Sequence, residues 1–399
     1  MSTAPDPLGP WLRARASLPA QAAAVLLLVV SVVEIVRQGA DEVDNRVVVR
    51  AARVLLHGGS PYADKRFLYL PSSVPLAVPE ALLGDSVLRV LVPAVTAALI
   101  LLGWWAALRI FGLGLRSRLG VGVVCGLAYF APFHSDVALG NWTAVSVAAL
   151  PVALALAARG RWVTAAAVVG AAIAFKPMLV PLALLFVFAR KWRALGVMVA
   201  VPLAASVLAA LAMPRPRLFF TRTLPFLLRG QDSYAKPYDA SLVAILPRWG
   251  TPQAAATAVA FALAALGVWA AWYRWRRGGD LRLRLVETAS GLMLAAFLVS
   301  RPAFLHYALT VLPVLLASLP LRGSVPRSPW FWIVLLPQNT ALQWPYTEPG
   351  DRRAFKDAVI LTGLAVLVSC HAVKRTSPAR EPLLTRGAPR ARALYKSAD

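Results

Sequence analysis

Residues 39–83 read GADEVDNRVVVRAARVLLHGGSPYADKRFLYLPSSVPLAVPEALL and form a polar, aromatic segment between two long apolar ones. Within it, residues 46–57 place Val, Ala and Leu on one helical stripe and Arg and His on the other, a pattern typical of a helix that lies at a membrane surface. A glycine pair follows, and glycine tolerates the left-handed conformation that often ends a helix. The segment therefore predicts an amphipathic interfacial helix that ends at Gly58.

The composition identifies a membrane protein. The 399 residues are 59% hydrophobic and 15% charged, with a mean hydropathy of +0.64, whereas soluble domains are about 45–50% apolar and about 25% charged. The net charge of +24 comes from small basic clusters between apolar segments, which is where orientation signals lie. Lipid phosphate is therefore the expected anionic partner, and nucleic-acid binding is not expected.

The apolar segments and basic clusters predict an all-α transmembrane bundle of about twelve crossings. A crossing needs about 20 apolar residues, and the positive-inside rule places both termini in the cytoplasm. We expect a cytoplasmic tail over 1–17, one transmembrane domain over 18–373 and a disordered basic cytoplasmic tail over 374–399. In a plasma membrane this orientation puts residues 39–83 on the outer face. The expected single crossings lie near 18–37, 86–112, 119–134, 194–213, 252–272, 329–341 and 357–373, and one further crossing follows residue 142 and ends at Arg159 and Arg161.

Two apolar segments break in the middle and predict short helical hairpins. One breaks at Lys176-Pro177 and the other at Ser300-Arg301-Pro302, with His306 just beyond, and each begins and ends near basic residues. Arms of about 14 residues span about 21 Å, which is less than the roughly 30 Å hydrocarbon core. Lys176 is therefore expected in a recess, where a charge is costly and marks a functional site unless it reaches the surface.

An acid in an outer loop and cations at two hairpin apices suit sugar transfer from a lipid phosphate. That reaction needs a base for the acceptor hydroxyl and cations for the departing phosphate. Asp44 is the expected base. The expected phosphate-binding residues are Lys176, Arg301 and His306.

Five motifs follow one another along the chain. They are the run from Asp44 to Gly58-Gly59-Ser60-Pro61-Tyr62 with Tyr69-Leu70-Pro71, then Leu139-Gly140-Asn141-Trp142, Ala174-Phe175-Lys176-Pro177, Asp239-Ala240-Ser241-Leu242 and Ser300-Arg301-Pro302 with His306. In this order they resemble glycosyltransferase family 87, whose members are GT-C class membrane enzymes that include polyprenol-phosphate-mannose-dependent mannosyltransferases. The resemblance covers roughly residues 20–320. It implies an inverting transfer of a hexose, mannose by preference, from a polyprenyl-phosphate donor to a glycolipid or cell-envelope glycan, with Asp44 as the base.

The sequence departs from the family pattern in two places. Val48 stands where a tyrosine is common, and Asn141-Trp142 replaces a frequent Gln-x-Asn. These departures leave the acceptor and the sugar open, and the family also borders on arabinofuranose-transferring relatives. The candidate substrate-binding residues are Asp41, Glu42, Tyr62, Tyr69, Asp136, Asn141 and Asp239; Asp41 and Glu42 are also rivals for the role of base.

No cofactor or metal is expected from the motifs, and the two cysteines form no metal-binding spacing. Asp41, Glu42 and Asp44 could still supply oxygen ligands to a weakly bound divalent ion. A transporter or flippase of a lipid-linked sugar is the main alternative, because broken helices with charged apices also build transport sites. A catalytically inactive assembly subunit of the same fold is the third.

Overall fold

The structure is a computed structural model that describes residues 6–38, 43–229 and 236–374. Its α-helices are α1 (Leu8–Arg13), α2 (Leu18–Arg37), α3 (Val43–Leu56), α4 (Ser73–Leu76), α5 (Val78–Ala81), α6 (Asp85–Ile110), α7 (Arg118–Leu127), α8 (Ala131–Leu139), α9 (Thr143–Ala158), α10 (Trp162–Phe175), α11 (Ala183–Phe188), α12 (Trp192–Leu211), α13 (Leu224–Arg229), α14 (Leu242–Arg248), α15 (Gln253–Arg276), α16 (Leu281–Val299), α17 (Ala308–Ala317), α18 (Pro329–Leu335) and α19 (Pro349–Val373).

Short tight turns of helix join these elements. They are the 3₁₀ helices η1 (Pro61–Ala63), η2 (Pro177–Leu182), η4 (Lys236–Tyr238), η5 (Leu305–Tyr307), η6 (Val325–Arg327) and η7 (Leu336–Gln338), and the π-helix η3 (Phe219–Thr223). Within the described residues the only extended pairings are two isolated bridges. The expected all-α fold is therefore confirmed for this part of the chain.

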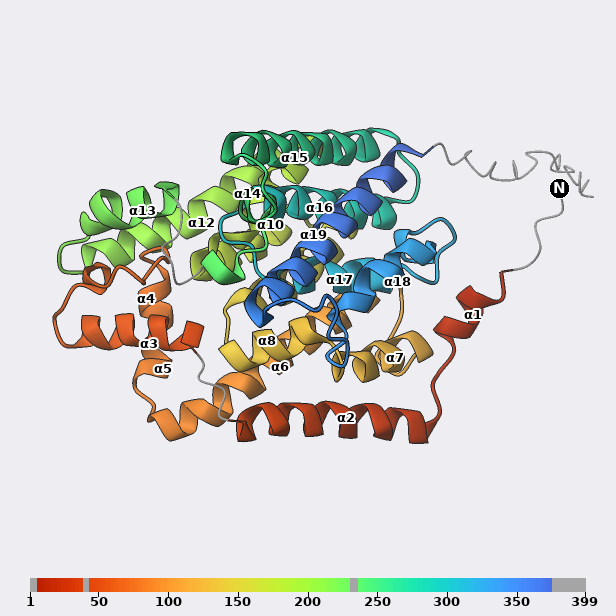
Figure 1. The fold of residues 1–399 in the computed structure, drawn as a ribbon, viewed down its shortest axis with the longest axis horizontal. Coiled ribbons are helices and arrows are strands. Elements are labelled where there is room, and N and C mark those ends of the chain that lie inside the picture. The colour runs from red at the N-terminus through yellow and green to blue at the C-terminus, as the bar shows by residue number, and fades with distance from the viewer. Residues whose placement is uncertain (1–5, 39–42, 230–235, 375–399) are drawn as a thin grey trace, which may run out of the picture.

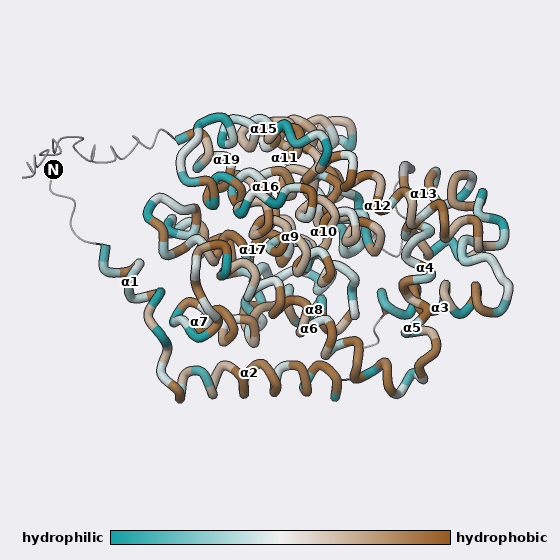
Figure 2. The backbone as a smooth tube through the Cα atoms, turned by 180° about the vertical axis from the view of Figure 1, so that it is seen from behind, coloured by the Kyte–Doolittle hydropathy of each residue, from teal (hydrophilic) through white to brown (hydrophobic). Residues whose placement is uncertain are grey.

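The helices form an elongated bundle with α1 at one end and α3, α4, α5 and α13 at the other (Figure 1). Hydrophobic residues predominate along α2, which lies on the outside of the bundle (Figure 2). Only 17% of the apolar stretch of α2 and 22% of that of α12 is buried inside the protein. Such exposed apolar surface suits contact with lipid rather than water.

The expected number of about twelve crossings is not confirmed. In the described part of the chain, α2, α6, α12, α15 and α19 are long and apolar enough to cross a membrane, which makes five, or six if the bent pair α8 and α9 counts as one. The segment 119–134 contains the ten-residue α7 and the start of α8, and 329–341 contains the seven-residue α18. Helices of ten and seven residues are about 15 and 11 Å long and cannot span the hydrocarbon core alone.

The centre of the bundle is a continuous apolar core to which α6, α9, α10, α16, α17 and α19 all contribute. Gly103 permits the close approach of α6 to α9, because a Cβ atom there would lie 2.4 Å from the carbonyl oxygen of Val147. Small residues at such crossings let helix backbones pack tightly in membranes. This rigid centre holds the helix ends from which the site is built.

A second apolar cluster forms the lobe at the far end of the bundle. It joins α3, α4, α5 and the first turns of α6, and includes Val48, Val49, Phe67 and Trp142. The predicted amphipathic helix is confirmed as α3, with its Val and Ala face buried and Arg46 and Arg50 exposed. Its buried face anchors α3 on the lobe, so the start of α3 has a fixed position.

Both expected hairpin breaks are present. The chain is extended at Lys176, between α10 and η2. Residues 300–304 separate α16 from η5 and α17. The first arm of the second hairpin is α16, which has 19 residues. It is longer than the expected arm of about 14 residues, whose length is about 21 Å at 1.5 Å per residue.

Candidate active site

Asp44 lies in the first turn of α3 and is partly buried. An acidic side chain is favoured there because the N-terminal end of a helix carries a partial positive charge. The carboxylate accepts a hydrogen bond of 2.5 Å at Oδ2 from the side-chain amide Nδ2 of Asn141. Two residues 97 positions apart in the sequence are therefore in direct contact.

Asn141 occupies the sharp turn between α8 and α9, whose axes differ by 118°. The preceding Gly140 has φ +59°, a left-handed conformation that glycine adopts at little cost. The turn leaves the Asn141 side chain buried, and its Oδ1 accepts from the backbone N–H of Thr143 at 2.8 Å. The amide is thereby fixed in place before any substrate binds.

Lys176 reaches the same amide from the opposite side. Its Nζ donates to Asn141 Oδ1 at 2.6 Å and to Thr143 Oγ1 at 2.9 Å. The ammonium also lies 5.5 Å from the centre of the Tyr307 ring, within the range of a cation–π interaction. Asp44, Asn141 and Lys176 form one hydrogen-bonded series, here called the Asp44–Asn141–Lys176 chain.

Asp136 supplies a second carboxylate to this region. It lies in α8, is fully buried, and neither of its oxygens has a hydrogen-bond partner among the described residues. It is close enough to Asp44 and Lys176 for their charges to act on it. Buried polar atoms without a partner are costly, which makes Asp136 a candidate for contact with a substrate.

A second set of hydrogen bonds docks α3 on the bundle. The indole Nε1 of Trp142 donates to Asn45 Oδ1 at 2.9 Å, and Asn45 Nδ2 donates to Glu80 Oε2 at 2.7 Å. Burial raises the pKa of Glu80, and the hydrogen bond from Asn45 partly offsets that rise. Asn141 and Trp142 thus hold two consecutive residues of α3.

The two tyrosines have different surroundings. Tyr62 is fully buried in an aromatic cluster, and its hydroxyl donates to the carbonyl oxygen of Tyr69 at 3.1 Å. Tyr69 packs against Trp142, with ring centres 6.0 Å apart. Burial, and then the negative charge of Asp44, raises the pKa of Tyr69 well above its usual value. Tyr69 therefore borders the site as a neutral phenol, whereas Tyr62 supports it from within the lobe.

Asp239 holds the loop of the second hairpin. Its Oδ1 accepts from the backbone N–H groups of Ser241 at 2.9 Å and Ala303 at 3.0 Å. Arg301 is exposed on that loop. The observed contacts of Asp239 are with the backbone, which fits a positioning role for the loop.

His306 is 1% exposed, and both of its ring nitrogens lack a partner among the described residues. It stacks on Phe304 and packs edge-on against Tyr307, whose ring also contacts Lys176. The structure thus brings His306 near Lys176, while Arg301 lies on the neighbouring exposed loop. Asp41 and Glu42 lie outside the described residues.

Comparison with known proteins identifies the family. The model of glycosyltransferase family 87 matches residues 67–301, more than half of the chain. The chain belongs to glycosyltransferase family 87. The match includes Asn141, Lys176 and Arg301 and begins after Asp44.

The chain is also similar to three named enzymes. Alpha-(1->3)-arabinofuranosyltransferases from two strains of Mycobacterium tuberculosis are each 27% identical over 289 residues, which are 71% of this chain and 65% of the relative. The corresponding enzyme of Mycolicibacterium smegmatis is 25% identical over 288 residues, 71% of this chain and 66% of the relative. The chain thus spans slightly less than two thirds of these relatives. No solved structure matches it.

Several residues of this candidate site were not predicted from the sequence. Thr143 holds Lys176, and Asn45 with Glu80 fixes α3. The only available signals were the position of Asn45 directly after Asp44 and that of Thr143 two residues after Asn141. Nothing in the sequence pairs Asn45 with Glu80, because they are 35 residues apart.

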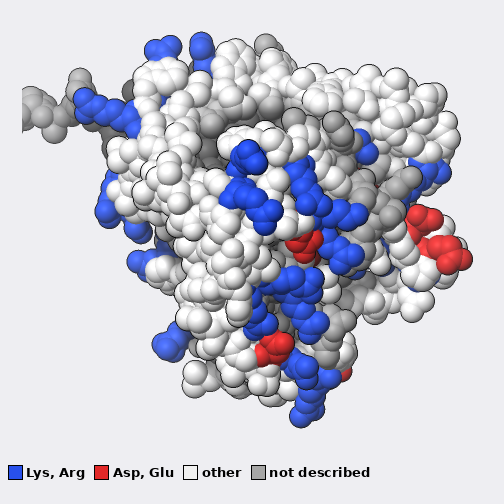
Figure 3. Space-filling view, turned by 90° about the vertical axis from the view of Figure 1, so that its left-hand side faces the viewer, with Lys and Arg blue, Asp and Glu red and all other residues white. Residues whose placement is uncertain are grey.

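The end of the molecule that bears α3 and α13 is basic. Lys and Arg side chains gather in the middle of this face, with fewer Asp and Glu side chains among them (Figure 3). In the described part of the chain no three His, Cys, Asp or Glu residues are grouped as metal ligands. The face beside Asp44 therefore suits an anionic substrate.

Proposed function

We propose that this protein is a membrane arabinofuranosyltransferase. It transfers arabinofuranose from a polyprenyl-phosphate donor to a hydroxyl of a glycolipid or cell-envelope glycan on the outer face of the plasma membrane. The Asp44–Asn141–Lys176 chain is the observation that carries this proposal, because it joins a carboxylate to a partly buried ammonium beside a basic face.

Asp44 acts as the general base in this proposal. It removes the proton of the acceptor hydroxyl as that oxygen forms a bond to the anomeric carbon of the sugar. The bond from that carbon to the donor phosphate breaks, and its electrons go to the phosphate oxygen. One displacement of this kind inverts the anomeric configuration. A positioned base typically contributes 10²- to 10⁴-fold to the rate.

The departing polyprenyl phosphate gains negative charge, which nearby cations stabilise. Lys176 provides a fixed ammonium, and Arg301 provides an exposed guanidinium on the adjoining loop. His306 is buried, its ring nitrogens have no hydrogen-bond partner in the described part of the chain, and it can donate to a phosphate oxygen. Exposed apolar surface on the bundle offers lateral access for a polyprenyl chain, which supports a lipid-linked donor.

Arabinofuranose is favoured over the hexose first expected because the characterised relatives are named as arabinofuranosyltransferases. The test uses purified protein in vesicles with two synthetic donors, polyprenyl-phosphate arabinofuranose and polyprenyl-phosphate mannose, and a short arabinan acceptor. Mass spectrometry of the acceptor should show a gain of one pentose from the first donor only. A gain of hexose only would contradict the choice of sugar.

The same vesicles separate transfer from transport. A transporter moves the labelled donor between leaflets and forms no glycosidic bond, whereas the proposed enzyme elongates the acceptor without net movement of the donor. Net movement of the donor with an unchanged acceptor would contradict the proposed function.

A further inference from the structure

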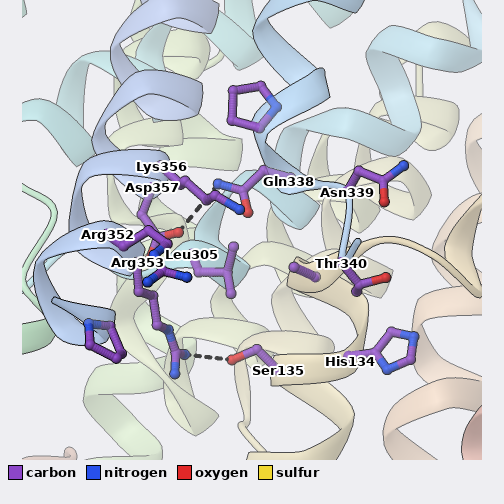
Figure 4. A pocket seen from close by; sticks show the side chains of 13 residues that line it. His134, Ser135, Leu305, Gln338, Asn339, Thr340, Arg352, Arg353, Lys356 and Asp357 are labelled. Atoms are coloured by element: carbon purple, nitrogen blue, oxygen red, sulfur yellow. Dashed lines mark hydrogen bonds between the residues drawn. The ribbon is translucent and has the colours of Figure 1, made fainter. Parts of the chain in front are cut away.

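A cavity of about 360 Å³ lies outside the Asp44–Asn141–Lys176 chain. The start of α19, residues 337–340 and α8 surround it (Figure 4). Leu305 also lines the cavity, while Tyr307, two residues further on, packs against Lys176. The turn η5 therefore has the cavity at one end and Lys176, a proposed donor phosphate-binding residue, at the other. A volume above about 300 Å³ is sufficient for a small ligand or a lipid headgroup.

The cavity lining is positively charged. Arg352, Arg353 and Lys356 come from the first two turns of α19, and Asp357 is the single carboxylate among the lining residues. Asp357 is buried and accepts from Gln338 Nε2 at 3.3 Å. Three cations against one carboxylate leave a net charge of about +2, which favours an anionic ligand.

The cations are held in place by the protein. A terminal nitrogen of Arg353 donates to Ser135 Oγ at 2.9 Å (Figure 4), and its guanidinium lies 5.4 Å from the centre of the Tyr238 ring. The ammonium of Lys356 donates to the carbonyl oxygen of Leu342.

The Nε of Arg352 is buried and has no hydrogen-bond partner among the described residues. A buried donor without an acceptor is costly, and a bound oxyanion would satisfy it.

The surroundings of the cavity are apolar and exposed. Tyr129, whose carbonyl oxygen accepts from the lining residue Thr340, is 58% exposed. The segment around residues 337–340 carries further large exposed side chains, which are Leu336 (60%), Leu342 (40%), Trp344 (45%) and Tyr346 (89%). A charged cavity beside such apolar side chains matches a ligand with an anionic head and a hydrocarbon chain.

We propose that this cavity binds the phosphate group of a lipid, with Arg352, Arg353 and Lys356 as its ligands. The lipid is either a polyprenyl phosphate or an anionic phospholipid, and both present the same phosphate chemistry to these cations. This proposal does not depend on the transfer of arabinofuranose, because it requires only that the lipid phosphate binds in the cavity.

The test measures equilibrium binding of radiolabelled farnesyl phosphate to the full-length protein in neutral detergent. The variant Arg352→Gln with Lys356→Gln removes two ligands. The matched control, Arg159→Gln with Arg193→Gln, removes two exposed charges elsewhere. Unlabelled farnesol, inorganic phosphate and phosphatidylglycerol serve as competitors, and thermal unfolding verifies that each variant is folded.

The proposed donor site at Lys176 also binds a lipid phosphate, so we expect the wild type to bind farnesyl phosphate at two sites. The cavity variant should weaken binding at one of these sites at least about tenfold, since hydrogen bonds to charged groups are strong, and the control should bind normally at both. Displacement by phosphatidylglycerol would assign the site to a structural phospholipid, and resistance to it would assign the site to a polyprenyl phosphate. An equal loss of binding in the control variant would overturn the proposal. So would displacement of the radiolabelled ligand by farnesol or by inorganic phosphate at the same concentrations as unlabelled farnesyl phosphate. If the double variant does not fold, Lys356→Gln is compared with the charge-preserving Lys356→Arg, and equal binding by the two would overturn it.

Discussion

Asn141 has only one orientation of its amide that satisfies both neighbours. The Asp44 carboxylate can only accept and the Lys176 ammonium can only donate. The NH₂ group must therefore face Asp44 and the carbonyl oxygen must face Lys176, as the structure has them. This asymmetry makes Asn141 a positioning residue that fixes Asp44, the proposed base, relative to the ammonium of Lys176.

Replacement Asn141→Ala should lower kcat about 100-fold, the loss expected when a reacting group is misplaced by about 1 Å. The KM for the donor should change little, because Arg301 and His306 remain. Steady-state transfer assays on the purified variant measure both constants. Gln253→Ala, which removes an amide that bonds to the carbonyl oxygen of Val243, is the control. A tenfold rise in KM with unchanged kcat would contradict a positioning role.

At the scale of elements, the site depends on how α3 docks against the turn between α8 and α9. Burial of Val48 and Val49 holds the helix, and Asn45 links it to Trp142 and Glu80. Glu80 lies on α5, outside the long apolar helices, and burial raises its pKa above the ordinary value of 4.5. The folded protein therefore holds this proton more tightly than the unfolded chain.

This difference gives stability a pH dependence with a definite sign. The stabilisation from proton binding is fully present below about pH 4.5, the unfolded pKa, and is lost as the pH rises through the raised folded pKa. Glu80→Gln mimics the protonated side chain and keeps an acceptor for Asn45. The variant should match the wild type near pH 4 and unfold at a higher temperature near pH 7. An equal change at both pH values would contradict this account.

At the scale of the whole molecule, the orientation in the membrane decides which face meets the acceptor. The predicted topology puts the loop after α3 outside and the start of α12 inside. We expect a membrane-impermeant maleimide to label Lys65→Cys but not Arg193→Cys in intact cells, and to label both after the cells are opened. The background carries Cys125→Ser and Cys370→Ser. Labelling of position 193 in intact cells would contradict the predicted orientation.

The sequence predicted some elements because their signals are local. The stripe of valines predicted α3, and proline after Lys176 predicted the break in that hairpin. The count of crossings is not confirmed because hydropathy does not distinguish a spanning helix from a short buried one such as α7 or α18. Buried helices of a large bundle are as apolar as lipid-facing ones.

The site was predictable as a set of residues and much less so as a set of contacts. Asp44 and Lys176 were expected on one face, and the structure joins them through Asn141. Tyr62, one of the candidate substrate-binding residues, is fully buried in the lobe. Glu80 was not expected at all, because its hydrogen bond to Asn45 depends on tertiary packing between segments 35 residues apart.

The most direct test of the proposed mechanism compares transfer rates of Asp44→Asn and Asp64→Asn. Asp64 lies in the same segment, residues 39–83, and accepts a hydrogen bond from the backbone N–H of Arg66, so its replacement controls for the loss of one charge. We predict that Asp44→Asn lowers kcat by about 10²- to 10⁴-fold with unchanged donor binding and unfolding temperature, while Asp64→Asn stays within about twofold of the wild type. Transfer by folded Asp44→Asn at the wild-type rate would contradict the assignment of Asp44 as the base.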